Sequence, residues 1–193
     1  MKKKVAIFAS GEGTNAERII HFFQGNKFIN INLIICNRRS AGVFARAERL
    51  GVEALYMPKS QFEQPDLLNH VLKEHQIDFI VLAGFLLFVP NETLAAYHRC
   101  IINIHPSLLP KHGGKGMYGD KVHEAVVAEG DRESGITIHY ANEHYDEGEI
   151  IFQAKVPVSP SDTPHDVATK VHELEYKYYP EIILKLLSDD SSR

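Results

Sequence analysis

Short apolar runs alternate with amphipathic stretches along most of this chain, and this alternation constrains the fold more than any other feature. Five such runs occupy residues 5–9, 33–36, 52–57, 79–82 and 101–104. Strands that are short and continuously apolar are typical of a parallel sheet covered by helices on both faces. The sequence therefore predicts an α/β fold with a doubly wound, mostly parallel sheet.

The amphipathic stretches between these runs predict helices over residues 16–23, 43–50, 67–75 and 94–97. Gly25 and Gly51 stand just after the first two stretches, where glycine commonly ends a helix. Pro90 stands just before the fourth stretch, and proline is favoured at the start of a helix. The first half of the chain is therefore predicted to alternate between strands and helices.

The second half of the chain predicts an antiparallel region and a final helix. Residues 136–140 and 150–156 predict two antiparallel strands, preceded by a short helix near residues 122–129. Thr163 and Pro164 predict the start of the final helix. The residues expected to form its buried stripe are Val167, Val171, Leu174 and Tyr178. Pro180 predicts a kink or a break in this helix, because proline lacks a backbone N–H.

Charge and cysteine content exclude several classes of protein. The formal net charge is −4 and the sequence has no basic stripe, which argues against nucleic-acid binding. No apolar run approaches the roughly 18 residues that a membrane-spanning helix needs. Cys36 and Cys100 lack the spacing of a metal site and predict free thiols in a reducing compartment. We therefore expect a cytoplasmic protein that does not bind membranes.

Asn103 and His105 stand two positions apart at the end of the fifth apolar run, so an extended strand directs both side chains to one face. Both can donate hydrogen bonds to an oxygen that gains negative charge. A carboxylate such as Asp146 can orient and charge the imidazole. This combination indicates an acyl-transfer centre. Motifs this short also arise by chance, so a polar strand end with a surface histidine and a solvated acidic turn is the alternative.

Residues 10–16 have the sequence SGEGTNA and join the first predicted strand to the first helix. The free N–H groups and the dipole at a helix start favour an anion such as phosphate. Gly11, Gly13 and Ala16 also fit the dinucleotide fingerprint, so an NADP-dependent reductase is a competing hypothesis. Arg38 and Arg39 after the second strand suit the 2′-phosphate of NADP. A glycine turn that only joins a strand to a helix is a third interpretation.

Residues 111–119 form a glycine-rich segment, and long loops inside compact domains are usually functional. We expect this loop to be mobile and its part from Gly113 to Gly119 to close over bound substrates; a merely tolerated insertion is the alternative. The histidines that could suggest a metal site are His105, His112, His139 and His144. They lack both the helical spacing of zinc ligands and a pair of cysteines to complete a tetrahedral site. We therefore expect no metal, and His139 is equally well explained as a half-buried strand residue.

Several motifs together resemble the folate-dependent glycinamide ribonucleotide formyltransferases, and the likeness covers nearly the whole chain. The residues that carry it are Ser10-Gly11 through Asn15, Ile35-Cys36-Asn37-Arg38, Leu82-Ala83-Gly84-Phe85, Asn103-Ile104-His105-Pro106-Ser107-Leu108-Leu109-Pro110, Gly135-Ile136-Thr137-Ile138-His139-Tyr140, Asp146-Glu147-Gly148-Glu149-Ile150-Ile151 and Gln153-Ala154-Lys155-Val156-Pro157-Val158. The string from Asn103 to Pro110 is highly specific to formyltransferases that use 10-formyltetrahydrofolate.

The resemblance implies a Rossmann-like formyltransferase that moves a formyl group from the co-substrate 10-formyltetrahydrofolate to the amine of glycinamide ribonucleotide, in purine synthesis. It implies a single domain, residues 1–193, with a phosphate-binding half at 1–100 and a catalytic, folate-binding half at 101–193. The implied catalytic residues are Asn103, His105 and Asp146. The expected phosphate-binding residues are Gly11, Gly13, Thr14 and Asn15, and Glu175 is expected to bind ribose. The expected folate-binding residues are Leu86, Leu87, Val89, Tyr140, Ala141, Asn142 and Asp146.

The chain departs from the family pattern at two positions. Leu87 stands where relatives often have an arginine, and Gln64 lies near the place of an arginine that meets the folate tail. Both departures concern how the benzoyl-glutamate end is held rather than the reaction. A sugar-nucleotide formyltransferase would share the catalytic residues, and a non-catalytic ligand-binding module is a further alternative. The expected partners are small-molecule substrates, and the expected assembly is a monomer or a homodimer.

Overall fold

The structure, a computed structural model, describes residues 2–189 and contains a seven-stranded sheet with the order β3-β2-β1-β4-β5-β6-β7. The strands are β1 (Lys3–Ala9), β2 (Ile29–Cys36), β3 (Glu53–Tyr56), β4 (Phe79–Leu82), β5 (Ile101–His105), β6 (Glu133–Tyr140) and β7 (Ile150–Pro157). The helices are α1 (Thr14–Phe23), α2 (Val43–Leu50), α3 (Lys59–Phe62), α4 (Pro65–Glu74), α5 (Asn91–Ala96), α6 (Asp120–Ala128) and α7 (Pro164–Asp189). Among the described residues, no helix combines the length and the apolar character needed to cross a bilayer.

The first five strands run parallel to one another. β1 pairs with β2 and β4, β2 pairs with β3, and β4 pairs with β5, all in parallel. β6 then runs antiparallel to both β5 and β7. These pairings confirm the predicted parallel sheet and its antiparallel extension. The carboxyl ends of β1, β4 and β5 lie at one edge, which is where open α/β sheets bind ligands.

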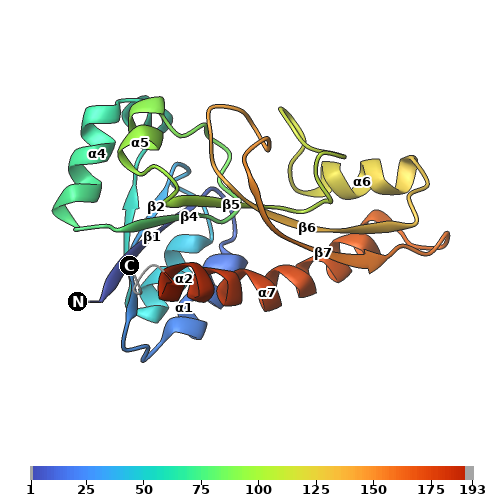
Figure 1. The fold of residues 1–193 in the computed structure, drawn as a ribbon, viewed down its shortest axis with the longest axis horizontal. Coiled ribbons are helices and arrows are strands. Elements are labelled where there is room, and N and C mark those ends of the chain that lie inside the picture. The colour runs from blue at the N-terminus through green and yellow to red at the C-terminus, as the bar shows by residue number, and fades with distance from the viewer. Residues whose placement is uncertain (1, 190–193) are drawn as a thin grey trace.

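Alternate residues of β1 face two separate hydrophobic cores. Val5, Ile7 and Ala9 pack in the core that includes α1 and α7, whereas Ala6 and Phe8 pack in the core that includes α3 and α4. Figure 1 shows α1, α2 and α7 below the sheet and α4 and α5 above it. A strand buried on both faces gains from apolar side chains at every position. This explains why β1 is continuously apolar rather than alternating.

One helix was missed by the sequence prediction. The single turn α3 precedes α4 and buries Phe62 completely. A helix of four residues is too short to display a helical hydrophobic period, so periodicity could not find it. Its role is to bring the Phe62 ring against Phe8 of β1, with the ring centroids 5.6 Å apart.

The predicted break at Pro180 is absent, because α7 continues through this residue to Asp189. Proline cannot donate to the carbonyl four residues earlier, which belongs to Tyr176. The Nε of Arg18 on α1 donates to that carbonyl instead, at 3.3 Å. A side chain from the neighbouring helix thus satisfies the acceptor that Pro180 leaves free.

The buried stripe of α7 differs from the prediction at two positions, because Leu174 and Tyr178 are only partly buried. Val167 and Val171 are buried as expected, and Tyr179 is fully buried. The hydroxyl of Tyr179 donates to the carbonyl of Leu82 at 2.8 Å. This bond attaches the final helix to the carboxyl end of β4.

Replacing Tyr179 with phenylalanine is expected to lower the free energy of unfolding by about 0.5–1.5 kcal/mol, because it removes a buried hydrogen bond. Urea denaturation followed by circular dichroism measures this difference. Tyr178→Phe is the matched control and should change stability by less than about 0.5 kcal/mol. Equal losses in the two variants would contradict the role given to the Tyr179 hydroxyl.

Candidate active site

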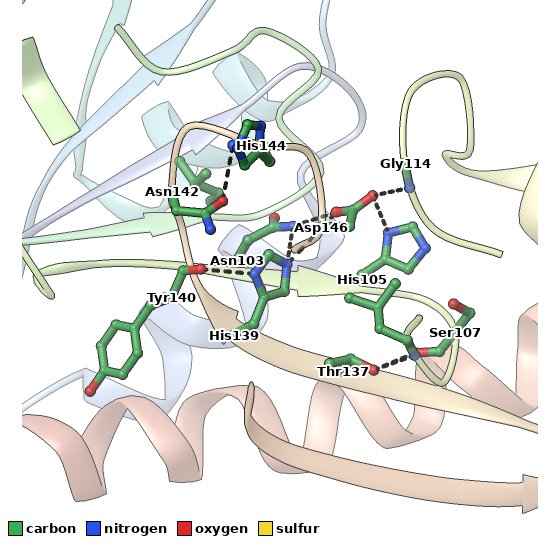
Figure 2. A network of polar contacts seen from close by, with 12 residues as sticks. Asn103, His105, Ser107, Gly114, Thr137, His139, Tyr140, Asn142, His144 and Asp146 are labelled. Carbon is green, nitrogen blue, oxygen red and sulfur yellow. Dashed lines mark hydrogen bonds and ion pairs between the residues drawn. The ribbon is translucent and has the colours of Figure 1, made fainter. Parts of the chain in front are cut away.

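Three side chains meet at the carboxyl edge of the sheet, as the sequence motif predicted. Asn103 and His105 lie on β5, and Asp146 lies in the loop between β6 and β7. The carboxylate of Asp146 is 3.4 Å from Nδ2 of Asn103 and 3.4 Å from Nδ1 of His105 (Figure 2). Both separations are slightly longer than an ordinary hydrogen bond. Neither contact to Asp146 is a short hydrogen bond, so the Asn103 amide and the His105 ring can reorient toward a ligand.

Asp146 is held in position by the backbone around it. Its φ of +59° is unusual for a residue with a side chain, and its Oδ2 accepts a 2.9 Å hydrogen bond from the Gly114 N–H. Gly148 allows the loop to close, because a Cβ at this position would lie 1.7 Å from the Tyr140 carbonyl oxygen. Burial raises the pKa of Asp146, but the contacts from His105, His139 and the Gly114 N–H outweigh it, so the pKa lies well below its ordinary value.

This lowered pKa makes stability depend on pH. The ionised carboxylate stabilises the folded state above the unfolded pKa of about 4, and this contribution is lost as pH falls toward the lower folded pKa. We expect Asp146→Asn to be less stable than the parent protein at pH 7, and the difference to shrink below about pH 4. Urea titrations across this range measure it. A difference that stays constant from pH 7 to pH 3 would contradict the shift.

The ring of His105 is oriented through both of its nitrogens. Nε2 lies 2.8 Å from the carbonyl oxygen of His112, and since a carbonyl only accepts, Nε2 carries a proton and donates. Nδ1 faces the carboxylate of Asp146. In its protonated form the ring donates from both nitrogens, and it then presents a charged donor to an oxygen in the site.

His139 is a site residue that the sequence prediction left as an ordinary strand histidine. Its Nδ1 donates to the Tyr140 carbonyl at 2.9 Å, so in the neutral ring Nε2 is left as an acceptor. That Nε2 lies 3.1 Å from Nδ2 of Asn103, which donates to it (Figure 2). His139 is only 2% exposed. It orients the amide of Asn103, and so it supports the donor rather than serving as a metal ligand.

These residues line a cavity of about 950 Å³ that extends along the sheet edge to the start of α1. This volume lies near the upper end of the usual range for ligand pockets. The residues predicted to bind phosphate and ribose all line it: Gly11, Gly13, Thr14, Asn15 and Glu175. The first N–H groups of α1 have no partner within the helix and can bind an anion.

The turn before α1 is fitted closely to its surroundings. Gly13 has a φ of +76°, and a Cβ there would lie 2.5 Å from a methyl group of Val43. Nδ2 of Asn15 donates to Oε2 of Glu175 at 3.0 Å, which joins the turn to α7. Nδ1 of His172 lies 2.8 Å from the same oxygen, and this bond raises the pKa of His172. Glu175 is thus held by two donors at one oxygen.

A second group of ionisable residues lies outside this cavity. Ligand atoms of His112, Glu129 and Asp131 lie within 4.8 Å of one another, a spacing that could hold a metal ion. The ammonium of Lys111 contacts both carboxylates. A cation of the protein itself therefore neutralises this cluster.

Comparison with known proteins identifies the family. The formyl transferase family model matches residues 3–183. Phosphoribosylglycinamide formyltransferase of Bacillus subtilis is 37% identical over 192 residues, which are 96% of this chain and 95% of that protein. The chain belongs to the formyl transferase family. A solved structure of a formyl transferase, glycinamide ribonucleotide transformylase 1 from Geobacillus kaustophilus, is 34% identical with a TM-score of 0.88 and covers 97% of this chain and 100% of that one.

Some formyl transferases are longer than this chain. The chloroplastic phosphoribosylglycinamide formyltransferase of Vigna unguiculata is 40% identical over 97% of this chain, but the chain spans 62% of its length. For the Arabidopsis thaliana relative, which is 41% identical over 94% of this chain, the chain spans 64%.

Most residues expected to bind folate from the formyl transferase pattern line the cavity. They are Leu86, Leu87, Val89, Ala141, Asn142 and Asp146. Tyr140 is not among the lining residues, and its ring lies beneath the guanidinium of Arg99, 4.3 Å from the ring centroid. Neighbouring residues of a strand point to opposite faces, so Tyr140 points away when His139 faces the site. Phe88 and Tyr145 also line the cavity, with ring centroids 5.2 Å apart.

Gln64 lies apart from the cavity. It is exposed and its Nε2 donates to the Ser60 carbonyl at 2.7 Å. It is not among the residues that line the cavity, whereas Leu87 is. Of the two departures from the family pattern, only Leu87 therefore borders the space in which a ligand would lie.

Proposed function

We propose that this chain transfers the formyl group of 10-formyltetrahydrofolate to the primary amine of glycinamide ribonucleotide, as a step of purine synthesis. The observation that carries the proposal is the meeting of Asn103, His105 and Asp146 in a cavity that also contains an anion-binding helix start. One end of this cavity suits acyl transfer and the other suits a phosphorylated substrate.

The chemistry follows from the donors. The amine nitrogen attacks the formyl carbon, and the carbonyl oxygen gains negative charge. The amide of Asn103 and the Nδ1–H of His105 each lie 3.4 Å from the carboxylate of Asp146. Both can donate to the carbonyl oxygen. A preorganised donor of this kind typically contributes about 3–4 kcal/mol to the barrier reduction. No covalent bond to the protein is needed.

Proton transfer completes the reaction. The attacking nitrogen must lose a proton, and the folate nitrogen must gain one as its bond to the formyl carbon breaks. The lowered pKa keeps Asp146 ionised but makes it a weak base, so it would relay the proton of the amine, directly or through water, rather than hold it. His105 can return a proton to the leaving nitrogen. The products are the formylated amide and tetrahydrofolate.

The mononucleotide would bind across the first turn of α1. Its phosphate would accept hydrogen bonds from the backbone of the turn at Gly13, Thr14 and Asn15. Oε2 of Glu175 is already bonded to Asn15 and His172, so Oε1 is the oxygen left to accept from ribose hydroxyls. The pterin of the folate would lie on the opposite side, against residues 86–89 and 141–146. The glycine-rich loop would then close over both substrates.

Replacing Asn15 with alanine is expected to raise KM for glycinamide ribonucleotide about 10-fold with little change in kcat, because it weakens ground-state binding rather than the transition state. Steady-state kinetics with the folate held at saturation measures both constants. Asn30→Ala, at the exposed and opposite end of β2, is the control. An unchanged KM in Asn15→Ala would contradict the binding site proposed for the phosphate.

One assay tests the proposed function against its alternatives. The protein is mixed with 10-formyltetrahydrofolate and glycinamide ribonucleotide, and formation of tetrahydrofolate is followed by absorbance. We expect turnover with this amine and none with an amino-sugar nucleotide. Turnover only with the amino sugar would favour a sugar-nucleotide formyltransferase. Quenching of NADPH fluorescence by the protein, without formyl transfer, would favour a reductase.

The cellular setting is also part of the proposal. Neither Cys36 nor Cys100 forms a disulfide in the described part of the chain, which fits a reducing compartment such as the cytoplasm. The chain would act there on small molecules, as a monomer or a homodimer.

A further inference from the structure

The backbone of residues 112–114 touches both ionisable groups of the site. The carbonyl of His112 accepts from Nε2 of His105 at 2.8 Å. The Gly114 N–H donates to Asp146 at 2.9 Å, as Figure 2 shows. This short segment therefore sets where the imidazole and the carboxylate lie relative to each other. The position of the segment matters for the geometry of the site.

The side chain of His112 anchors this segment on the side away from the cavity. Its Nε2 lies 2.7 Å from Oδ2 of Asp131, and the imidazole is only 5% exposed. Its φ is +55°, a backbone conformation that costs energy for a residue with a side chain. A strained conformation persists when contacts around it hold it in place. The bond to Asp131 is such a contact.

Asp131 is a stable acceptor for the hydrogen bond from His112. Burial acts to raise its pKa, but the bonds from Lys111 and His112 outweigh burial and lower it. The carboxylate therefore stays ionised and keeps accepting from His112. Glu129 is farther from the imidazole, at 3.8 Å from Nδ1, and it is 55% exposed.

We propose that His112 is a positioning residue for the reaction: its imidazole, bound to Asp131, holds its own carbonyl against Nε2 of His105 and so directs Nδ1 of His105 toward the reacting oxygen. This inference rests on the proposed function for its kinetic consequence. The chain of contacts runs from Asp131 through His112 to His105, and none of these links passes through a substrate.

The test uses two substitutions of His112. His112→Asn keeps a residue that tolerates positive φ but is too short to reach Asp131, and His112→Gln keeps a donor at about the reach of Nε2. We expect kcat to fall about 10- to 100-fold in His112→Asn, with KM for both substrates and the melting temperature little changed, and His112→Gln to recover most of the loss. Asp131→Ala should reproduce the His112→Asn result. Glu129→Gln is the matched control and should leave kcat within about twofold.

A second measurement does not depend on turnover. The Nε2 proton of His105 should give a proton NMR signal that exchanges slowly with water in the parent protein and rapidly in His112→Asn. A protected signal in the variant, or a kcat within twofold of the parent, would overturn the proposal. If the parent protein shows no formyl transfer, the proposed function fails, and the NMR signal alone decides whether His112 positions His105.

Discussion

Replacing Asp146 with asparagine is expected to lower kcat by about 100- to 1000-fold, with KM for both substrates changed much less. The amide cannot keep His105 charged, and it cannot accept a proton from the attacking amine. Losses of this size are typical when one preorganised electrostatic group is removed from a site. Because the interaction belongs to the transition state, kcat and kcat/KM should fall together. Steady-state assays that follow folate absorbance measure all of these constants.

Glu147 offers a control one residue away. It is exposed and is not among the residues that line the cavity, so Glu147→Gln should keep nearly the parent kcat while it removes the same charge from the same loop. Circular dichroism at pH 7 establishes that Asp146→Asn is folded under assay conditions. A folded Asp146→Asn variant with a near-normal kcat would remove Asp146 from the chemistry.

The parallel sheet could be predicted from the sequence because its physical cause is local. A strand covered on both faces must be apolar at every position, and the helices between such strands must be apolar on one side only. Both patterns are visible without knowledge of the partners. The break expected at Pro180 was wrong, because the continuity of the helix there depends on a distant contact. The Tyr176 carbonyl receives its hydrogen bond from Arg18, a residue 158 positions away along the chain.

The meeting of Asn103, His105 and Asp146 was predicted from motif and strand geometry, but the part played by His139 was not. In the structure His139 of β6 is the direct cross-strand partner of Asn103 on β5. That relation depends on the register of two strands, which the sequence of either strand does not specify. The sequence does show that His139 and Tyr140 are neighbours on a strand and so point to opposite faces of the sheet. It does not show which of the two faces lines the cavity.

The loop that carries Asp146 shows a similar limit. Gly148 is needed because the chain passes close to the Tyr140 carbonyl, and no residue with a Cβ fits there. Sequence alone marks the glycine as a turn residue but does not identify the carbonyl it must avoid. The same holds for His112, whose buried imidazole and bond to Asp131 appear only when the loop is folded. Contacts between distant segments decide the fine geometry of this site.

Replacing His105 with alanine is also expected to lower kcat by about 100- to 1000-fold, because the site loses a charged donor to the oxyanion. His70→Ala, on the exposed face of α4, is the control and should be near normal. The informative variant combines His105→Ala with Asp146→Asn. Asp146 acts largely through the imidazole that it charges, so the double variant should be only a few-fold slower than the slower single variant. Losses that multiply would mean that the carboxylate and the imidazole act independently, and the pairing seen in the structure would then not be part of the mechanism.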